Sequence, residues 1–336
     1  MKTKKILMLT NRVLDAYRKD NNAPYQNELP EFQFFSTQLL NKNLELFITH
    51  YKTYSEGKEL AWKYNPQEKK WVKTIIDEPD LVLDRISGDI QGWRKLISEM
   101  QRKGIRVFND PHIAYLCTDK VMTYEKFKEY SIPTYYPHDK ETLIDAYERL
   151  RQENDCDIVF IKPRYGNKGK DIRVVKKGEK EKIKEINEFN DLDYILQPFI
   201  ESSDGIPELG IRTRHDIRII TLNNNIEASY VRMPKANGFL SNYDLGGDLT
   251  YFGKPFEQLP TKYIELANKI LKNMEYKQTK IISLDFITEN DSGLVKLVEL
   301  NNNTGFSDSK TRQIAPEDKQ VISLYVKALD EILNKN

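Results

Sequence analysis

The segment LVKLVELNNNTGF, residues 294–306, begins as an apolar strand and ends in a carboxylate followed by three consecutive asparagines. A second apolar stretch, IISLDFITE at 281–289, precedes it and carries another carboxylate, Asp285. The turn-forming residues NDSG at 290–293 separate the two stretches. This order predicts an antiparallel hairpin whose far end carries polar side chains.

The register of this hairpin brings three oxygen-bearing side chains together. Counting outward from a turn centred near residue 292 places Asp285 opposite Glu299, and the period of two returns Asn301 to the same face. Like charges directly across two strands are destabilising unless something neutralises them, and converging hard oxygen ligands suit Mg²⁺ on nucleotide phosphates. The sequence therefore predicts a metal site at Asp285, Glu299 and Asn301. The structural alternative is that both carboxylates pair with nearby Lys or Arg.

The composition limits the class of protein. The chain has 336 residues, enough for two or three packed subdomains. Its 52 basic and 51 acidic residues nearly cancel, so we expect no nucleic-acid partner and no membrane-binding face. The apolar runs have the length of strands, and the N-terminal segment turns polar too early for a signal peptide. We therefore expect a cytoplasmic protein, and the two cysteines, Cys117 and Cys156, agree with a reducing compartment.

The secondary-structure pattern divides the chain into three parts: residues 1–117, 118–200 and 201–336. The first part alternates strands and helices, as in an open α/β sheet, and has no glycine-rich dinucleotide fingerprint. Strands are predicted at 4–10, 44–51, 79–86 and 105–110, and helices at 31–43 and 89–103.

The other two parts have an α+β pattern. In 118–200 the patterns predict helices at 118–130 and 140–152, and strands at 156–163, 172–175 and 193–200. From about residue 214 the strands 215–222 and 226–233, the 281–301 hairpin and a closing helix at 318–333 predict a mainly antiparallel layer.

A glycine-containing loop joins two of these strands in IKPRYGNKGKDIRVV, residues 161–175. Gly166 and Gly169 would let the backbone N–H groups approach phosphates, while Lys162 and Lys168 supply positive charge. The spacing is not that of a Walker loop, and the structural alternative is a plain hairpin. Lys120, early in its helix, is by itself only a surface lysine.

In combination, these motifs resemble the ATP-grasp superfamily, within it the branch of glutathione synthetase and the ribosomal-protein glutamate ligases. The resemblance covers residues 80–310. The matching segments, in the order of that family, are NDPHIAYLCTDK, SIPT, VFIKPRYGNKGKDI, YILQPFI, HDIRI, VRMPKANGFLSNYDLGG, SLDFI and VELNNNTG. It implies an N-terminal open α/β pre-ATP-grasp domain, then a nucleotide bound between two α+β subdomains, with ATP and Mg²⁺, or Mn²⁺, as cofactors.

The resemblance also implies roles for individual residues. Lys120 and Lys162 would contact the nucleotide phosphates, and Arg218 and Arg232 would face the transferred phosphate. The strand Gln197, Pro198, Phe199 and Ile200 would read the adenine through its backbone, with Glu201 or Asp204 near the ribose. Asn242, with Gly246 and Gly247, would lie near the phosphates and the nucleophile; the structural alternative for this segment is a flexible loop. For Arg218 and Arg232 the structural alternative is a side chain that points to solvent.

The activity implied is ligation of a carboxylate to an amine through an acyl phosphate. Such chemistry needs positioned cations and metal ligands rather than a covalent nucleophile. A kinase on the same scaffold and a non-catalytic ATP-binding protein are the alternatives. The sequence does not identify the carboxylate or the amine, which could be small molecules or peptides, and it leaves a homo-oligomer open. An insertion, ESSDGIPELGIRTRH at 201–215, is longer than related ligases carry. Its Arg212, Arg214 and His215 fit either an acceptor pocket or a surface loop.

Overall fold

The computed structural model divides the chain into two compact units. The first comprises residues 1–113, 277–281 and 303–336, and the second comprises 114–276 and 282–302. The described residues are 2–10, 30–54, 58–86, 90–138, 141–166, 171–184, 186, 194–234, 248–252, 259–274, 276, 278–290, 292–305 and 314–334. The three-part division at 117/118 and 200/201 remains a prediction. Among the described helices, none is long and apolar enough to cross a membrane.

The first unit is built on a six-stranded sheet with the order β4-β3-β2-β1-β5-β6. The strands are β1 (Lys4–Thr10), β2 (Leu44–His50), β3 (Lys58–Asn65), β4 (Lys70–Asp77), β5 (Leu81–Arg85) and β6 (Val107–Phe108). β2, β1, β5 and β6 run parallel, and the apolar runs in β1 and β5 are buried as expected for a covered parallel sheet. The predicted open α/β sheet is confirmed.

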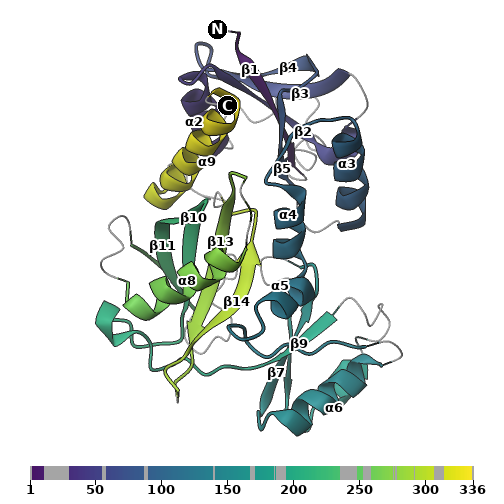
Figure 1. Ribbon diagram of the computed structural model, residues 1–336, viewed down its shortest axis with the longest axis vertical. Coiled ribbons are helices and arrows are strands. Elements are labelled where there is room, and N and C mark those ends of the chain that lie inside the picture. The colour runs from purple at the N-terminus through teal and green to yellow at the C-terminus, as the bar shows by residue number, and fades with distance from the viewer. Residues whose placement is uncertain are drawn as a thin grey trace. The chain divides into compact units, whose positions relative to one another are not determined.

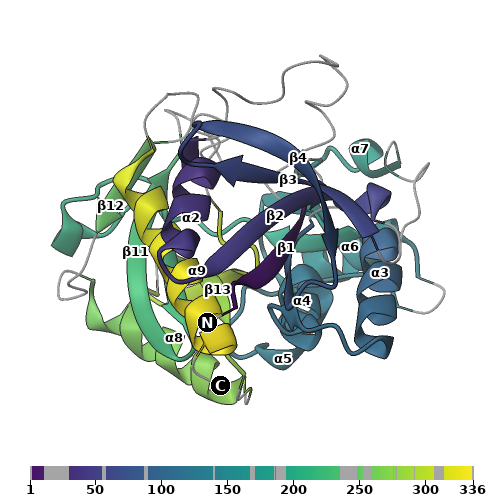
Figure 2. The same ribbon diagram turned by 90° about the horizontal axis from the view of Figure 1, so that it is seen from above.

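Helices cover both faces of this sheet. Figures 1 and 2 show α2 (Pro30–Leu40) and α9 (Pro316–Asn334) on one face and α3 (Ile90–Arg102) on the other. Tyr325 of α9 makes edge contacts with the rings of Phe35 in α2 and Phe108 in β6. The helix at the C-terminal end of the described chain therefore completes the core of the first unit.

The hairpin β3–β4 was not predicted. It extends the sheet by antiparallel pairing with β2 and within itself. Its outer face places the cross-strand pair Leu60 and Ile75 at 46% and 62% exposure, while Ala61 and Ile76 on the other face are buried. Apolar residues thus occupy both faces, so the sequence lacks the clean alternation that marks a half-buried strand.

The second unit contains two further sheets (Figure 1). The smaller is antiparallel, with the order β8-β7-β9, and the larger has the order β12-β11-β10-β13-β14. The strands are β7 (Ile158–Pro163), β8 (Arg173–Lys176), β9 (Tyr194–Pro198), β10 (Asp216–Leu222), β11 (Asn225–Met233), β12 (Asp248–Phe252), β13 (Ile281–Thr288) and β14 (Val295–Asn301). The helices are α4 (Pro111–Thr118), which begins in the first unit, α5 (Lys120–Lys126), α6 (Leu143–Glu153), α7 (Glu181–Lys184) and α8 (Thr261–Asn273).

Each sheet of the second unit packs against its own helix. Leu143, Ala146 and Leu150 of α6 pack with Val159 and Ile161 of β7 in one buried cluster. On the larger sheet, the hydroxyl groups of Tyr263 in α8 and Thr288 in β13 are hydrogen-bonded. The mainly antiparallel layer expected after residue 214 is confirmed by the β10–β11 and β13–β14 pairs.

The helix predicted over 118–130 is wrong in its extent. The chain forms α4 and then a separate α5, which begins at Lys120 because Asp119 caps it by accepting from the N–H groups of Val121 and Met122. The helix ends at Lys126. Farther along, the N–H of Ile132 donates to the carbonyl of Leu297 in β14, at 3.0 Å. The segment after α5 therefore pairs with the edge of the larger sheet rather than continuing the helix.

Candidate functional site

The β13–β14 hairpin has the register that the sequence predicts. Asp285 pairs directly with Glu299, and Ser283 pairs with Asn301. A β-bulge makes this possible, because the ladder steps from Phe286↔Leu297 to Asp285↔Glu299 and skips Val298. The extra residue lets Leu297 and Leu300, three positions apart, both be buried while Glu299 turns to the polar face.

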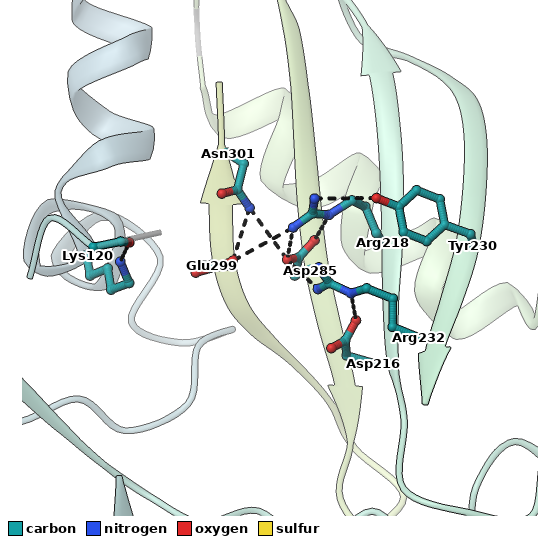
Figure 3. A network of polar contacts seen from close by, with 9 residues as sticks. Lys120, Asp216, Arg218, Tyr230, Arg232, Asp285, Glu299 and Asn301 are labelled. Carbon is teal, nitrogen blue, oxygen red and sulfur yellow. Dashed lines mark hydrogen bonds and ion pairs between the residues drawn. The ribbon is translucent and has the colours of Figure 1, made fainter. Parts of the chain in front are cut away.

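Asn301 lies on the same face as the two carboxylates (Figure 3). Its side-chain amide nitrogen is 3.3 Å from Glu299 Oε1 and 3.5 Å from Asp285 Oδ2. The three predicted metal ligands are therefore brought together. Among the described residues there is no group of three or more His, Cys, Asp or Glu placed to hold a metal ion, so the amide would have to complete this set.

Two arginines from the neighbouring strands point at Asp285. Arg218 of β10 donates from Nε to Oδ1 at 2.6 Å and from Nη2 to Oδ2 at 2.5 Å, and Arg232 of β11 donates from Nη2 to Oδ2 at 2.7 Å. Their side chains are only 13% and 10% exposed, so the interpretation that they point to solvent is wrong. Arg218 Nη2 also lies 3.8 Å from Glu299 Oε1.

The charges explain how Asp285 stays ionised. Burial opposes ionisation of its carboxyl, but the adjacent guanidinium groups of Arg218 and Arg232 outweigh burial and hold its pKa well below the ordinary value. The alternative of carboxylate–arginine pairing thus describes Asp285 in this structure, with Glu299 partly exposed beside it. The oxygen donors still form the hard set that a divalent cation prefers.

Asp216 is a member of this network that the sequence analysis missed. It is the register partner of Arg232, whose Nε donates to Asp216 Oδ1 at 2.5 Å. Burial raises the pKa of Asp216 to about 6, with Arg232 opposing and Asp285 adding to the rise. Its position two residues before Arg218, on the same face of one strand, could have indicated that Asp216 belongs to the site.

Lys120 stands across from Glu299 (Figure 3). Its ammonium donates to the carbonyl of Gly166 at 2.5 Å, which joins α5 to the loop after β7. Burial lowers the pKa of Lys120, while the negative charges of Glu299 and Asp119 oppose that effect. The loop and helix are further joined by a two-bond ion pair between Arg164 and Asp119, at 2.8 and 2.6 Å. Arg164 was not singled out in the sequence.

Lys162, at the end of β7, is the second cation of the site. Its ammonium donates to Gln197 Oε1 of β9 at 2.7 Å. Burial lowers its pKa to about 8, and the charges of Glu299 and Lys120 act on it in opposite directions. Both lysines are therefore close enough to sense Glu299 and each other, although they come from a different part of the unit than the carboxylates.

The two residues predicted to contact the ribose, Glu201 and Asp204, lie in the 201–215 insertion, which follows β9. Glu201 accepts two bonds from Arg214, at 2.8 and 2.7 Å, and Arg214 also lies over the ring of Phe199. Asp204 is exposed, and its N–H donates to the side chain of Asn290 in the β13–β14 turn. Glu201 thus has an ionic partner within its own loop.

The insertion at 201–215 is a folded loop that is closed by backbone hydrogen bonds. Ile206 and Ile211 pair through both backbone hydrogen bonds, around the short 3₁₀ helix η3 (Pro207–Leu209). Gly205 has a φ of +75°, and a Cβ there would lie 2.2 Å from the Ile211 carbonyl oxygen. His215 is buried, and burial lowers its pKa. Arg212 is exposed. Among the described residues, neither His215 nor Arg212 has a hydrogen bond or ion pair with the residues around Asp285.

Some predicted positions lie outside the described residues. These are Lys168 and Gly169 of the phosphate loop, and Asn242, Gly246 and Gly247. Gly166 is described, and a Cβ on it would lie 2.9 Å from the Cβ of Pro163. The roles of all site residues remain predictions.

Comparison with protein families identifies the class. The model of the RimK-like ATP-grasp domain matches residues 128–324. The chain belongs to this family of ATP-grasp ligases. No curated protein sequence matches it.

Solved structures of ligases share the fold. D-alanyl-alanine synthetase A from Vibrio cholerae is 13% identical, with both chains covered in full and a TM-score of 0.66. The ATP-grasp ligase PsnB, complexed with a phosphomimetic variant of a minimal precursor, Mg and ADP, is 12% identical over 98% of this chain and 100% of that chain, with a TM-score of 0.57. A Chryseobacterium gregarium RiPP-associated ATP-grasp ligase, in complex with ADP and a leader and core peptide, is 13% identical over 99% and 97%, with a TM-score of 0.56.

Proposed function

We propose that the protein uses ATP to join a carboxylate to an amine, releasing ADP and phosphate. A carboxylate oxygen of the substrate attacks the γ-phosphorus, and the bond to ADP breaks. The amine then attacks the resulting acyl phosphate at carbon, an amide forms, and phosphate leaves. The observation that carries the proposal is the convergence of Lys120 and Lys162 on one side and Asp285, Glu299 and Asn301 on the other.

The residues divide the work by charge. Lys120 and Lys162 neutralise the nucleotide phosphates. Arg218 and Arg232 stabilise the charge that develops on the phosphoryl group in the transition state of its transfer. Asp285, Glu299 and Asn301 would hold Mg²⁺, which supplies charge neutralisation between the phosphates when bound. The chemistry of this donor set, two carboxylates and an amide on one face, fits that ion.

Two kinds of substrate are supported by the structural neighbours. D-alanyl-alanine synthetase is named for a dipeptide product, whereas PsnB was solved with a variant of a minimal precursor and the Chryseobacterium gregarium ligase with a leader and core peptide. We propose that the carboxylate belongs to an amino acid or a peptide. The adenine lies along Gln197–Ile200, and the ribose lies at the start of the 201–215 insertion.

Oxygen-18 labelling tests this function. The protein is incubated with Mg²⁺, ATP and a panel of carboxylate and amine pairs, and released phosphate and coupled products are followed by mass spectrometry. A carboxylate labelled with ¹⁸O must pass one labelled oxygen to phosphate if an acyl phosphate forms. A stable phosphorylated product without free phosphate would identify a kinase instead. Absence of any nucleotide turnover across a broad panel would favour a non-catalytic ATP-binding protein.

A further inference from the structure

The side chain of Gln197 uses both ends of its amide although it is 5% exposed. Its Oε1 accepts from the ammonium of Lys162 at 2.7 Å, and its Nε2 donates to Thr134 Oγ1 at 2.9 Å. Thr134, also 5% exposed, donates its hydroxyl proton to the carbonyl of Ile132 at 3.0 Å. A row of three side-chain hydrogen bonds therefore runs from Lys162 to the backbone of segment 130–135.

The direction of these bonds is fixed by chemistry. An ammonium group can only donate, so the atom of Gln197 that faces Lys162 must be the oxygen. The amide nitrogen then faces Thr134, whose hydroxyl must accept from it and has its own proton left for Ile132. Because only one assignment satisfies all three groups, Gln197 holds the ammonium of Lys162 at a defined position.

Segment 130–135 connects this row to both sheets of the second unit. The N–H of Ile132 donates to the Leu297 carbonyl at 3.0 Å, and the N–H of Leu297 donates to the Tyr130 carbonyl at 2.7 Å. Tyr135 exchanges two backbone bonds with Leu196 of β9, at 2.8 and 2.7 Å. Leu297 lies two residues before Glu299, so the row ends on the strand that carries the carboxylate.

We propose that Gln197 is a positioning residue: with Thr134 it fixes the ammonium of Lys162 relative to strand β14, and thereby sets the affinity for nucleotide phosphates. This rests on the proposed function, in which Lys162 contacts the phosphates. The backbone role expected for residue 197 toward adenine is separate, because it uses main-chain groups. The competing explanation is that Gln197 is a satisfied buried amide that only stabilises the fold.

A double-mutant cycle separates these explanations. Affinity for the ATP analogue AMPPNP in Mg²⁺ is measured by calorimetry for wild type, Gln197→Met, Lys162→Met and the double variant, and each melting temperature is recorded. Gln197→Met keeps the length of the side chain and removes both hydrogen bonds. We expect it to weaken binding by about tenfold in the wild-type background and by less than about twofold in the Lys162→Met background, because positioning acts only through Lys162.

Further variants keep the test sharp if Gln197→Met folds poorly. Thr134→Val, which keeps the shape and removes the hydroxyl group, should weaken binding in the same direction, and Thr134→Ser should restore it. Gln101→Met on the exposed surface of α3 is the matched control and should bind as wild type.

The outcomes distinguish the two levels of inference. Wild-type protein that fails to bind AMPPNP would overturn the proposed function and this inference together. Wild-type binding combined with an equal loss in both backgrounds, or with no loss in Gln197→Met and Thr134→Val, would overturn only the positioning role.

Discussion

Arg218 and Asp285 face each other across the neighbouring strands β10 and β13 through two parallel hydrogen bonds, 2.6 and 2.5 Å long. Arg232 adds a third bond to the same carboxylate. Both oxygens of Asp285 are thus engaged by arginine in this structure. Among the described residues, Oδ2 accepts from both guanidinium groups, whereas Oδ1 accepts from Arg218 alone and keeps a lone pair that a cation could use.

Removing the charge of Asp285 should damage the fold. Asp285→Asn leaves two buried guanidinium groups facing a neutral amide, so we expect a loss of about 3–5 kcal/mol in the free energy of unfolding. Urea unfolding followed by circular dichroism measures this. In this variant Arg218 keeps Glu299 as a neighbour and Arg232 keeps Asp216. A loss below about 1 kcal/mol would mean that these two carboxylates replace Asp285 fully.

Removing the charge of Glu299 should instead damage the chemistry. Glu299 is 31% exposed, and its nearest ionic contact within the described part of the chain is 3.8 Å long, so Glu299→Gln should leave the melting temperature nearly unchanged without Mg²⁺. Turnover should fall by about two orders of magnitude, because a charge contact near the transferring phosphoryl group is lost. Steady-state rates beside melting curves check both halves. Near-normal turnover would refute the metal-ligand role.

The lowered pKa of Lys162 predicts how nucleotide affinity depends on pH. The free protein loses the ammonium charge as pH rises through about 8, and phosphates favour the charged form. Affinity for AMPPNP should therefore be flat below that pH and fall up to about tenfold per unit above it. Calorimetry from about pH 7 to about pH 9.5 measures the fall. Lys162→Arg keeps its charge and should lose most of this dependence; an unchanged profile would assign the titration to another group.

Two glycines of the insertion provide a matched stability test. Gly205 and Gly210 both have positive φ, but only at Gly205 would a Cβ meet backbone, at 2.2 Å. Gly210→Ala should cost about 1 kcal/mol of local stability, from the left-handed conformation alone, and Gly205→Ala should cost more than about 2 kcal/mol. Amide hydrogen exchange of Ile206 and Ile211, which are paired in the loop, reports the difference. Equal effects would show that the loop relaxes around Gly205.

The pairing of Asp285 with Glu299 could be predicted from sequence, but the way it is achieved could not. Extending the ladder away from the turn, from Thr288↔Val295 without interruption, would have placed Val298 opposite Asp285. The bulge at Val298 corrects this by one residue. In the sequence, the bulge is marked by Leu297 and Leu300, which lie three positions apart and so break the alternation of a regular strand.

The partners of the carboxylates were less accessible to sequence reasoning. Arg218, Arg232 and Asp285 were each singled out, yet their mutual hydrogen bonds depend on which strands are neighbours in the sheet. β10 lies between β11 and β13, although β12 and α8 separate β11 from β13 in the chain. Strand order of this kind follows from the packing of the whole unit, and a local pattern carries no record of it.

The position of α9 in the first unit has a consequence for synthesis on the ribosome. The parallel strands of that unit emerge early, but Tyr325, which contacts Phe35 and Phe108, emerges only after all of the second unit. Domains generally fold as units during translation, with the N-terminal one first. We expect that order to be reversed here, because the second unit can complete its core while α2 and β6 still lack their covering helix. A released chain that ends at residue 315 should accordingly resist protease within the strands of the second unit and be cut within α2 and β6.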